Sequence, residues 1–127
     1  MKRIVLDLQC AKFADAISQA LERSDPDFHI LRAESPGKTA ALCKSSHAYA
    51  LIMEVTSYTP WRLDERLRLR DEVKHLCPDC KVLFLVDENA NRALAANVLL
   101  AKKDGRIDSF IYASVSPTYL AAVLDTL

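Results

Sequence analysis

The feature that most constrains this chain is the regular alternation of short apolar runs with longer segments of helical period. Runs rich in Val, Ile, Leu and Phe occupy residues 3–8, 28–33, 49–55, 82–86 and 107–112. Such alternation is typical of βαβ units and a parallel sheet. The runs are almost continuously hydrophobic, as expected of strands that helices cover on both faces. The sequence therefore predicts an α/β domain with five strands in a doubly wound parallel sheet.

Apolar stripes in the intervening segments predict the helices that cover this sheet. Their members recur three or four positions apart, which places them on one side of a helix. Ser116 followed by Pro117 is a further signal, because both residue types favour a helix start. The stripes are Phe13, Ile17, Ala20 and Leu21; Leu69, Val73 and Leu76; and Leu120, Val123, Leu124 and Leu127.

Length and charge narrow the class of protein further. The 127 residues suit one domain with one core, and we expect residues 1–127 to form it. Lys plus Arg equals Asp plus Glu at 17 each, so no net charge draws the protein to nucleic acid or to an anionic membrane. The first apolar run reaches Asp7 before a signal-peptide core can form, so we expect a cytoplasmic protein with reduced thiols.

The residues that follow each strand are the candidate site. Right-handed crossovers bring the carboxyl ends of parallel strands together at one edge of the sheet, where ligands bind in such folds. Asp7 and Gln9 follow the first strand, Glu54 ends the third, Asp87 follows the fourth and Ala113 follows the fifth. We expect these five side chains to share one pocket.

This order of elements resembles the receiver (CheY-like) domains of bacterial two-component response regulators over essentially the whole chain. The segments that carry the resemblance are residues 2–9, 50–55, 81–87 and 108–124. The resemblance implies a flavodoxin-like (βα)5 fold with strand order 2-1-3-4-5. It also implies a pocket with an acidic pair for Mg²⁺, a phosphoacceptor Asp, a Ser or Thr, and a Lys.

The sequence departs from that receiver pattern at every one of these positions. Glu54 occupies the phosphoacceptor position, and its extra methylene displaces the nucleophilic oxygen. Only Asp7 remains of the acidic pair, with Gln9 nearby, so a hard ligand for Mg²⁺ is missing. Val86 or Asp87 occupies the position of the hydroxyl, and Ala113 replaces the lysine. We therefore expect a non-enzymatic pseudo-receiver without cofactor or metal, which signals through protein contact and independently of phosphorylation.

Two other interpretations of the pocket stay open at this point. Glu54 could imitate the charge of a phosphorylated Asp, or it could be a solvated carboxylate at a strand end. Alternatively, Asp7, Glu54 and Asp87 could still gather a divalent ion and accept a phosphoryl group. Under that hypothesis the protein is a working receiver with an atypical acidic pocket.

Cys77 and Cys80 form a C-x-x-C beside His75, which raises zinc or thiol chemistry as a third hypothesis. The pair lies between a predicted helix end and the next strand, whereas a redox C-x-x-C opens a helix. A structural turn is therefore the favoured interpretation. A complete zinc site would need Cys43, Cys10 or another chain.

Two further motifs carry little chemistry. The segment from Ser35 to Thr39 ends in Gly-Lys-Thr after a strand, but the phosphate-binding loop it suggests is too short, and Pro36 removes one backbone donor. Arginines at positions 62, 66, 68 and 70 alternate with acidic residues, which indicates a solvated helix face.

Candidate contact residues come from position and from the resemblance. Trp61 and Tyr112 are either anchors for a partner or aromatic residues packed at the edge of the core. Receivers often pair through helix four, strand five and helix five, so the resemblance implies a homodimer through that face. Its members here would be Ala95, Leu99, Ile111 and Tyr119.

Overall fold

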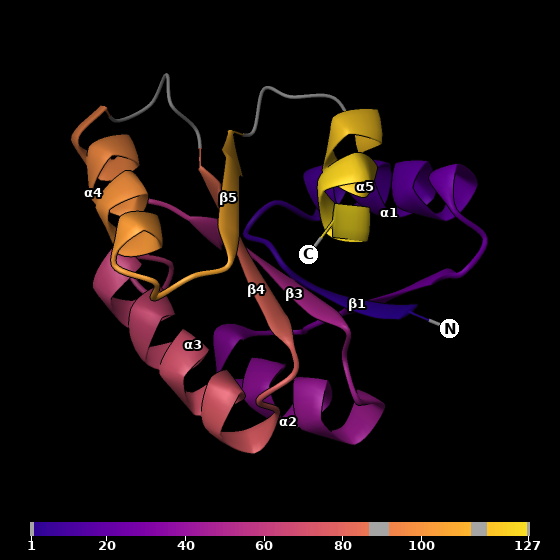
Figure 1. Ribbon diagram of the computed structural model, residues 1–127, viewed down its shortest axis with the longest axis horizontal. Coiled ribbons are helices and arrows are strands. Elements are labelled where there is room, and N and C mark those ends of the chain that lie inside the picture. The colour runs from indigo at the N-terminus through magenta and orange to yellow at the C-terminus, as the bar shows by residue number, and fades with distance from the viewer. Residues whose placement is uncertain (1, 87–91, 113–116, 127) are drawn as a thin grey trace.

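The computed structural model describes residues 2–86, 92–112 and 117–126, and it contains one parallel five-stranded sheet. The strand order is β2-β1-β3-β4-β5, so the predicted doubly wound topology is confirmed (Figure 1). The strands are β1 (Lys2–Asp7), β2 (Phe28–Arg32), β3 (Ala50–Val55), β4 (Lys81–Val86) and β5 (Ser109–Tyr112). The helices are α1 (Ala11–Ser24), α2 (Pro36–Ser46), α3 (Leu63–Leu76), α4 (Arg92–Lys103) and α5 (Pro117–Thr126).

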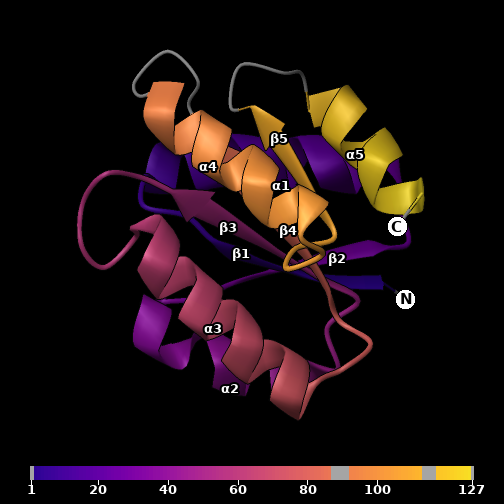
Figure 2. The ribbon, with the colours of Figure 1, turned by 60° about the vertical axis from the view of Figure 1, so that its left-hand side comes forward.

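The helices cover the sheet in two layers, with α1 and α5 on one face and α2, α3 and α4 on the other (Figures 1 and 2). Two clusters of buried side chains fill the space between the layers and the sheet. Alternate residues of β4 divide between them: Val82, Phe84 and Val86 face α2, α3 and α4, while Leu83 and Leu85 face α1 and α5. Burial on both faces explains why this strand is apolar without interruption.

The strand ends differ slightly from the sequence prediction, and β5 shows why. Its first residue is Ser109 rather than Ile107. The preceding Asp108 pairs with Val82 through both its backbone and its side chain: its N–H donates to the Val82 carbonyl at 3.0 Å. Its carboxylate accepts the Val82 N–H at 2.7 Å. A side-chain oxygen thus takes the place of a ladder carbonyl where the strand begins.

Helix α3 begins just beyond the carboxyl end of β3 and runs back along the sheet. Its first turn carries Asp64 and Glu65, and its last turn carries Lys74 and His75. This arrangement places acidic groups at the positive end of the helix dipole and basic groups at the negative end. The helix thereby presents Arg66, in its first turn, to the ends of β1 and β3.

Within the described residues, no helix combines the length and the apolar character that crossing a membrane requires.

Candidate functional site: a carboxylate pocket that carries its own cation

Asp7 is the last residue of β1 and is almost completely buried, with 2% of its surface exposed. A buried carboxylate is unfavourable unless a counter-charge and hydrogen bonds compensate its loss of hydration. Its strand neighbour in the ladder is Met53 of β3, which is itself fully buried. The compensation for Asp7 must therefore come from outside the sheet.

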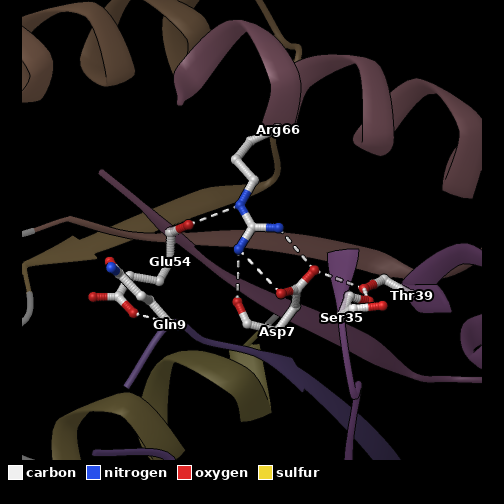
Figure 3. Close-up of polar contacts among 6 residues, drawn as sticks. All are labelled: Asp7, Gln9, Ser35, Thr39, Glu54 and Arg66. Carbon is white, nitrogen blue, oxygen red and sulfur yellow. Dashed lines mark hydrogen bonds and ion pairs between the residues drawn. The ribbon is translucent and has the colours of Figure 1, made fainter. Parts of the chain in front are cut away.

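Arg66 of α3 supplies that compensation. Its Nη1 donates to Asp7 Oδ2 at 2.7 Å, and its Nη2 donates to Asp7 Oδ1 at 3.1 Å. Nη2 also donates to the Asp7 carbonyl at 2.9 Å, and Nε donates to the Glu54 carbonyl at 2.8 Å. The guanidinium thus lies between the ends of β1 and β3 (Figure 3). Paired donors of this kind match a carboxylate in geometry as well as in charge.

Thr39 of α2 completes the partners of the Asp7 carboxylate. Its Oγ1 lies 2.6 Å from Asp7 Oδ2 and 3.3 Å from the Ser35 carbonyl. A hydroxyl has one hydrogen to donate, so the shorter contact with Asp7 takes it. The Gly-Lys-Thr segment therefore serves the carboxylate pocket instead of a phosphate, and the neighbouring Lys38 pairs with Glu34 at the surface at 2.7 Å.

Glu54 lies at the rim of the same pocket and is only partly buried. Its Oε1 accepts the backbone N–H of Gln9 at 2.8 Å, which ties the loop after β1 to the end of β3 (Figure 3). The Gln9 side chain itself is exposed. The Glu54 carboxylate thus accepts a backbone N–H from the loop after β1, and the Glu54 carbonyl accepts a hydrogen bond from Arg66.

These residues do not fit a Mg²⁺ ion of the kind that receivers bind. Mg²⁺ needs free carboxylate oxygens in near-octahedral array. Both oxygens of Asp7 already accept hydrogen bonds from Arg66 or Thr39. A cation in the pocket would also meet the guanidinium charge, which cannot be lost by deprotonation. Among residues 2–86, 92–112 and 117–126, no group of three or more His, Cys, Asp or Glu side chains is placed to hold a metal.

Of the five predicted pocket residues, Asp7 and Glu54 lie together with their side chains, whereas Gln9 joins them through its backbone N–H and its side chain is exposed. Asp87 and Ala113 lie outside the described residues. The prediction that Arg66 belongs to a solvated face is wrong, because its side chain is fully buried. The sequence does contain a signal for this burial. Arg66 lies seven positions before Val73, and therefore on the stripe of α3 that packs on the sheet.

Cys77 and Cys80 form a turn, as the favoured interpretation expected. Cys77 directly follows the last residue of α3, and the Cys80 N–H donates to the Cys77 carbonyl at 3.0 Å. His75 is exposed on the last turn of α3. The zinc set of His75, Cys77 and Cys80 is not assembled in the described structure, since no such group of ligands is found there.

The predicted contact residues divide between surface and core. Leu99 and Tyr119 are exposed, at 39% and 56%, and Ala95 is partly buried. Ile111 is a correction: it is 3% exposed and packs in the cluster under α1 and α5, because alternate residues of β5 face opposite layers. Trp61 and Tyr112 are both partly buried, and Tyr112 packs edge to face on Phe110, with ring centres 5.6 Å apart. Tyr58, in the loop between β3 and α3, is a further exposed aromatic residue, at 70% exposure.

Several solved structures have the same architecture as this chain. A response regulator receiver domain protein from Clostridium thermocellum matches with a TM-score of 0.79 and 17% identity, over 99% of this chain and 93% of that one. An orphan response regulator of H. pylori gives 0.75 and 16%, over 98% and 94%. A Burkholderia pseudomallei response regulator with a phosphorylated aspartic acid and a calcium ion gives 0.73 and 21%, over 98% and 66%.

Sequence comparison alone does not reveal this likeness. No protein-family model and no curated protein matches the chain. The agreement lies in the path of the backbone, from β1 through to α5. The chain therefore has the fold of the response regulator receiver domains, the CheY-like form of the flavodoxin-like sheet.

Proposed function

We propose that this protein is a receiver-like signalling module that acts through protein contact and does not depend on phosphorylation. The observation that carries the proposal is the buried pair of Asp7 and Arg66, whose closest oxygen and nitrogen are 2.7 Å apart. In this proposal the guanidinium takes the place of the metal ion that a phosphorylated receiver uses.

Three features of the pocket support this assignment. Both carboxylate oxygens of Asp7, buried at the end of β1, already accept hydrogen bonds from Arg66 or Thr39. Phosphoryl transfer needs a cation that is free to bind the transferred oxygens. The Arg66 guanidinium instead donates four hydrogen bonds to Asp7 and Glu54. Glu54 also carries its carboxylate one bond further from the backbone than an Asp would.

The test is to offer the full chain a phosphoryl donor. The protein is mixed with Mg²⁺ and acetyl phosphate and then weighed by intact mass spectrometry. We expect no gain of about 80 Da, the mass of one phosphoryl group. A second sample receives Mg²⁺ and beryllofluoride, and we expect no change in its amide NMR spectrum near Asp7 and Glu54. A phosphoryl adduct on Glu54 would instead support the atypical working receiver.

A pair of variants separates the role of Arg66 from a general loss of charge. Arg66→Gln removes the resident cation, and Arg68→Gln removes an exposed cation two positions along the same helix. Calorimetric titration with Mg²⁺ should show binding only to Arg66→Gln, provided that its circular dichroism spectrum stays native. If wild type and Arg68→Gln bind Mg²⁺ as well as Arg66→Gln does, Arg66 is not the group that keeps the metal out.

A further inference from the structure

β5 forms one edge of the sheet and lies between α4 and α5 (Figure 1). No other strand in the described part of the chain pairs with its outer side. The groove along this edge has a volume of about 370 Å³, and Lys102 of α4 and Tyr119 and Val123 of α5 are among its lining residues. The two helices thus leave the edge of β5 open.

The pairing of β4 with β3 shows which backbone groups of β4 are left for β5. The Lys81 N–H donates to the Tyr49 carbonyl at 3.0 Å, so the backbone of Lys81 faces β3. Backbone groups of successive residues in a strand point to alternate sides, so those of Val82 and Phe84 face β5. The Val82 N–H agrees with this, because it donates to the Asp108 carboxylate just before β5.

The register of β5 then decides which of its own backbone groups stay unpaired with β4. Phe84 lies opposite Phe110. In a parallel ladder such a residue bonds to the two neighbours of the residue opposite it, which are here Ser109 and Ile111. The N–H and C=O groups of Phe110 and Tyr112 therefore point away from β4, towards the open edge.

The two edges of the sheet differ in charge. β2, at the other edge, ends in Arg32 and carries the exposed His29. β5 consists of Ser, Phe, Ile and Tyr, without a charge. The carboxylate of Asp108 before it is engaged by Lys74 and Val82. Charges on an edge strand oppose pairing with another chain, and β5 lacks that protection.

We propose that β5 pairs in antiparallel orientation with β5 of a second copy of the chain, so that the two sheets become one. Two-fold symmetry centred on Ile111 places Phe110 of each copy opposite Tyr112 of the other. Both residues direct their backbone groups outward, so each such pair exchanges two N–H···O bonds. The same register sets aromatic side chains opposite each other, which is a favourable cross-strand pair.

The charge at the groove is complementary to a second copy. Among the described residues that line the groove, only Lys102 is charged, and it lies where β5 begins. An antiparallel copy brings its Tyr112 to that end, and the face of a tyrosine ring attracts an ammonium group. The two Lys102 side chains lie at opposite ends of the paired strands, so like charges stay apart. The exposed side chains of Leu99 and Tyr119 add apolar surface beside the strands.

This inference rests on the proposed action through protein contact, and it adds the partner and the groups that make the contact. It does not involve the carboxylate pocket, so a phosphoryl adduct on Glu54 would leave it intact. Contacts between the side chains of α4 and α5 alone would leave the outward backbone groups of β5 unbonded. The decisive measurements are therefore those that report on the backbone.

Amide hydrogen exchange of the wild-type full chain, followed by NMR at low and high protein concentration, tests the backbone pairing. The Phe110 and Tyr112 amides should exchange about tenfold more slowly where about nine chains in ten are paired, because only the unpaired chains exchange. The Ser109 and Ile111 amides bond to β4 in either state, so their exchange should not depend on concentration.

A matched pair of variants separates the backbone of Tyr112 from its ring. Tyr112→Pro removes the outward N–H and Tyr112→Val keeps it, while both lose the ring. Proline is tolerated on an edge strand where the missing donor faces away from the sheet. In sedimentation equilibrium at rising concentration, wild type should approach twice the chain mass and Tyr112→Val should still gain mass. Tyr112→Pro should stay at the mass of one chain.

Three results would overturn the proposal. They are a wild-type mass that stays at one chain at high concentration, exchange at Phe110 and Tyr112 that does not change with concentration, and equal masses for the two folded variants. If circular dichroism shows that Tyr112→Pro is not folded, the exchange of the wild-type amides decides the matter.

Discussion

Loss of the Arg66 side chain should damage the fold, because it would leave Asp7 buried without a counter-charge. Both side chains are nearly inaccessible, at 1% and 3% exposure. Removing one member of a buried pair destabilises a protein by about 3–5 kcal/mol. We expect Arg66→Met, which keeps the volume of the side chain, to lower the free energy of unfolding by that amount in urea denaturation at neutral pH.

Two further variants show that the effect comes from the pair. Arg68→Met on the exposed side of α3 should change stability by less than about 0.5 kcal/mol. The double variant Asp7→Asn/Arg66→Met removes both charges and should be more stable than Arg66→Met alone. Equal losses for the single and double variants would mean that Asp7 does not depend on Arg66.

Asp108 should make stability depend on pH. Burial disfavours its charge, but the Val82 N–H and the Lys74 ammonium bond to the carboxylate, and together with the charge of Lys81 they hold its pKa below the ordinary value. A lowered pKa means that the folded state binds this proton less readily than the unfolded chain. The ionised Asp108 carboxylate therefore adds fully to the free energy of unfolding at any pH above its ordinary pKa of 3.8. This stabilisation is lost as the pH falls through the lower pKa of the folded state.

Urea denaturation of Asp108→Asn against wild type tests this. Asn can still accept the Val82 N–H, so the variant isolates the charge. We expect the variant to be less stable at pH 7 and the difference to shrink as the pH falls below about 4. A difference that stays constant between pH 7 and pH 3 would contradict the assignment.

At the level of elements, α4, β5 and α5 form the surface that we propose as the contact between copies of the chain. A groove of about 370 Å³ runs along the β5 edge, with Phe110, Tyr112 and Tyr119 among its lining residues. Tyr119 and Leu99 are exposed beside it. We expect light scattering to give a mass that rises with concentration, and Tyr119→Glu to hold the mass at that of a monomer.

The matched control is His29→Glu, which changes an exposed ring on β2, at the opposite edge of the sheet from β5. It should leave the concentration dependence unchanged. A wild-type mass that stays monomeric at high concentration would rule out this contact.

The strands and helices could be predicted from the sequence because each apolar period reports directly on burial. The five predicted strands all exist, with ends that differ by a residue or two. At the start of β5 the difference arises because the Asp108 side chain accepts the Val82 N–H in place of a backbone carbonyl. The sequence also places Ile111 wrongly on the surface. The alternation along β5 shows that neighbouring side chains face opposite sides of the sheet, but it does not show which side α5 covers.

The pocket was harder to predict, because its decisive contact joins residues 59 positions apart. The strand ends indicate Asp7, Gln9 and Glu54, of which Gln9 takes part only through its backbone N–H. In the sequence, Arg66 cannot be told apart from three other arginines of the same segment, which lie at or near the surface. The sequence marks Thr39 only as the end of a phosphate motif, whereas its hydroxyl bonds to Asp7 in the structure. Only the packing of α2 and α3 on the same face of the sheet reveals both partners.

For the molecule as a whole, stability should depend little on salt. Acidic and basic side chains balance in number, and most of the described ion pairs, such as Lys38 with Glu34 and Arg68 with Asp64, are exposed. Exposed pairs contribute about 0–1 kcal/mol each and are screened, whereas the buried pair is not. We expect the free energy of unfolding to change by less than about 1 kcal/mol between about 0.05 and 0.5 M sodium chloride. A steep fall would show that surface charges dominate.

The Arg66 guanidinium at the end of β1 is joined to the backbone by covalent bonds, so it cannot leave the pocket. A diffusible ion fills a site according to its concentration, but a tethered group is always present at a high effective concentration. Chelators such as EDTA should therefore leave the unfolding midpoint of this protein where it was. Neither cellular starvation for divalent ions nor their excess would alter the charge that Asp7 experiences.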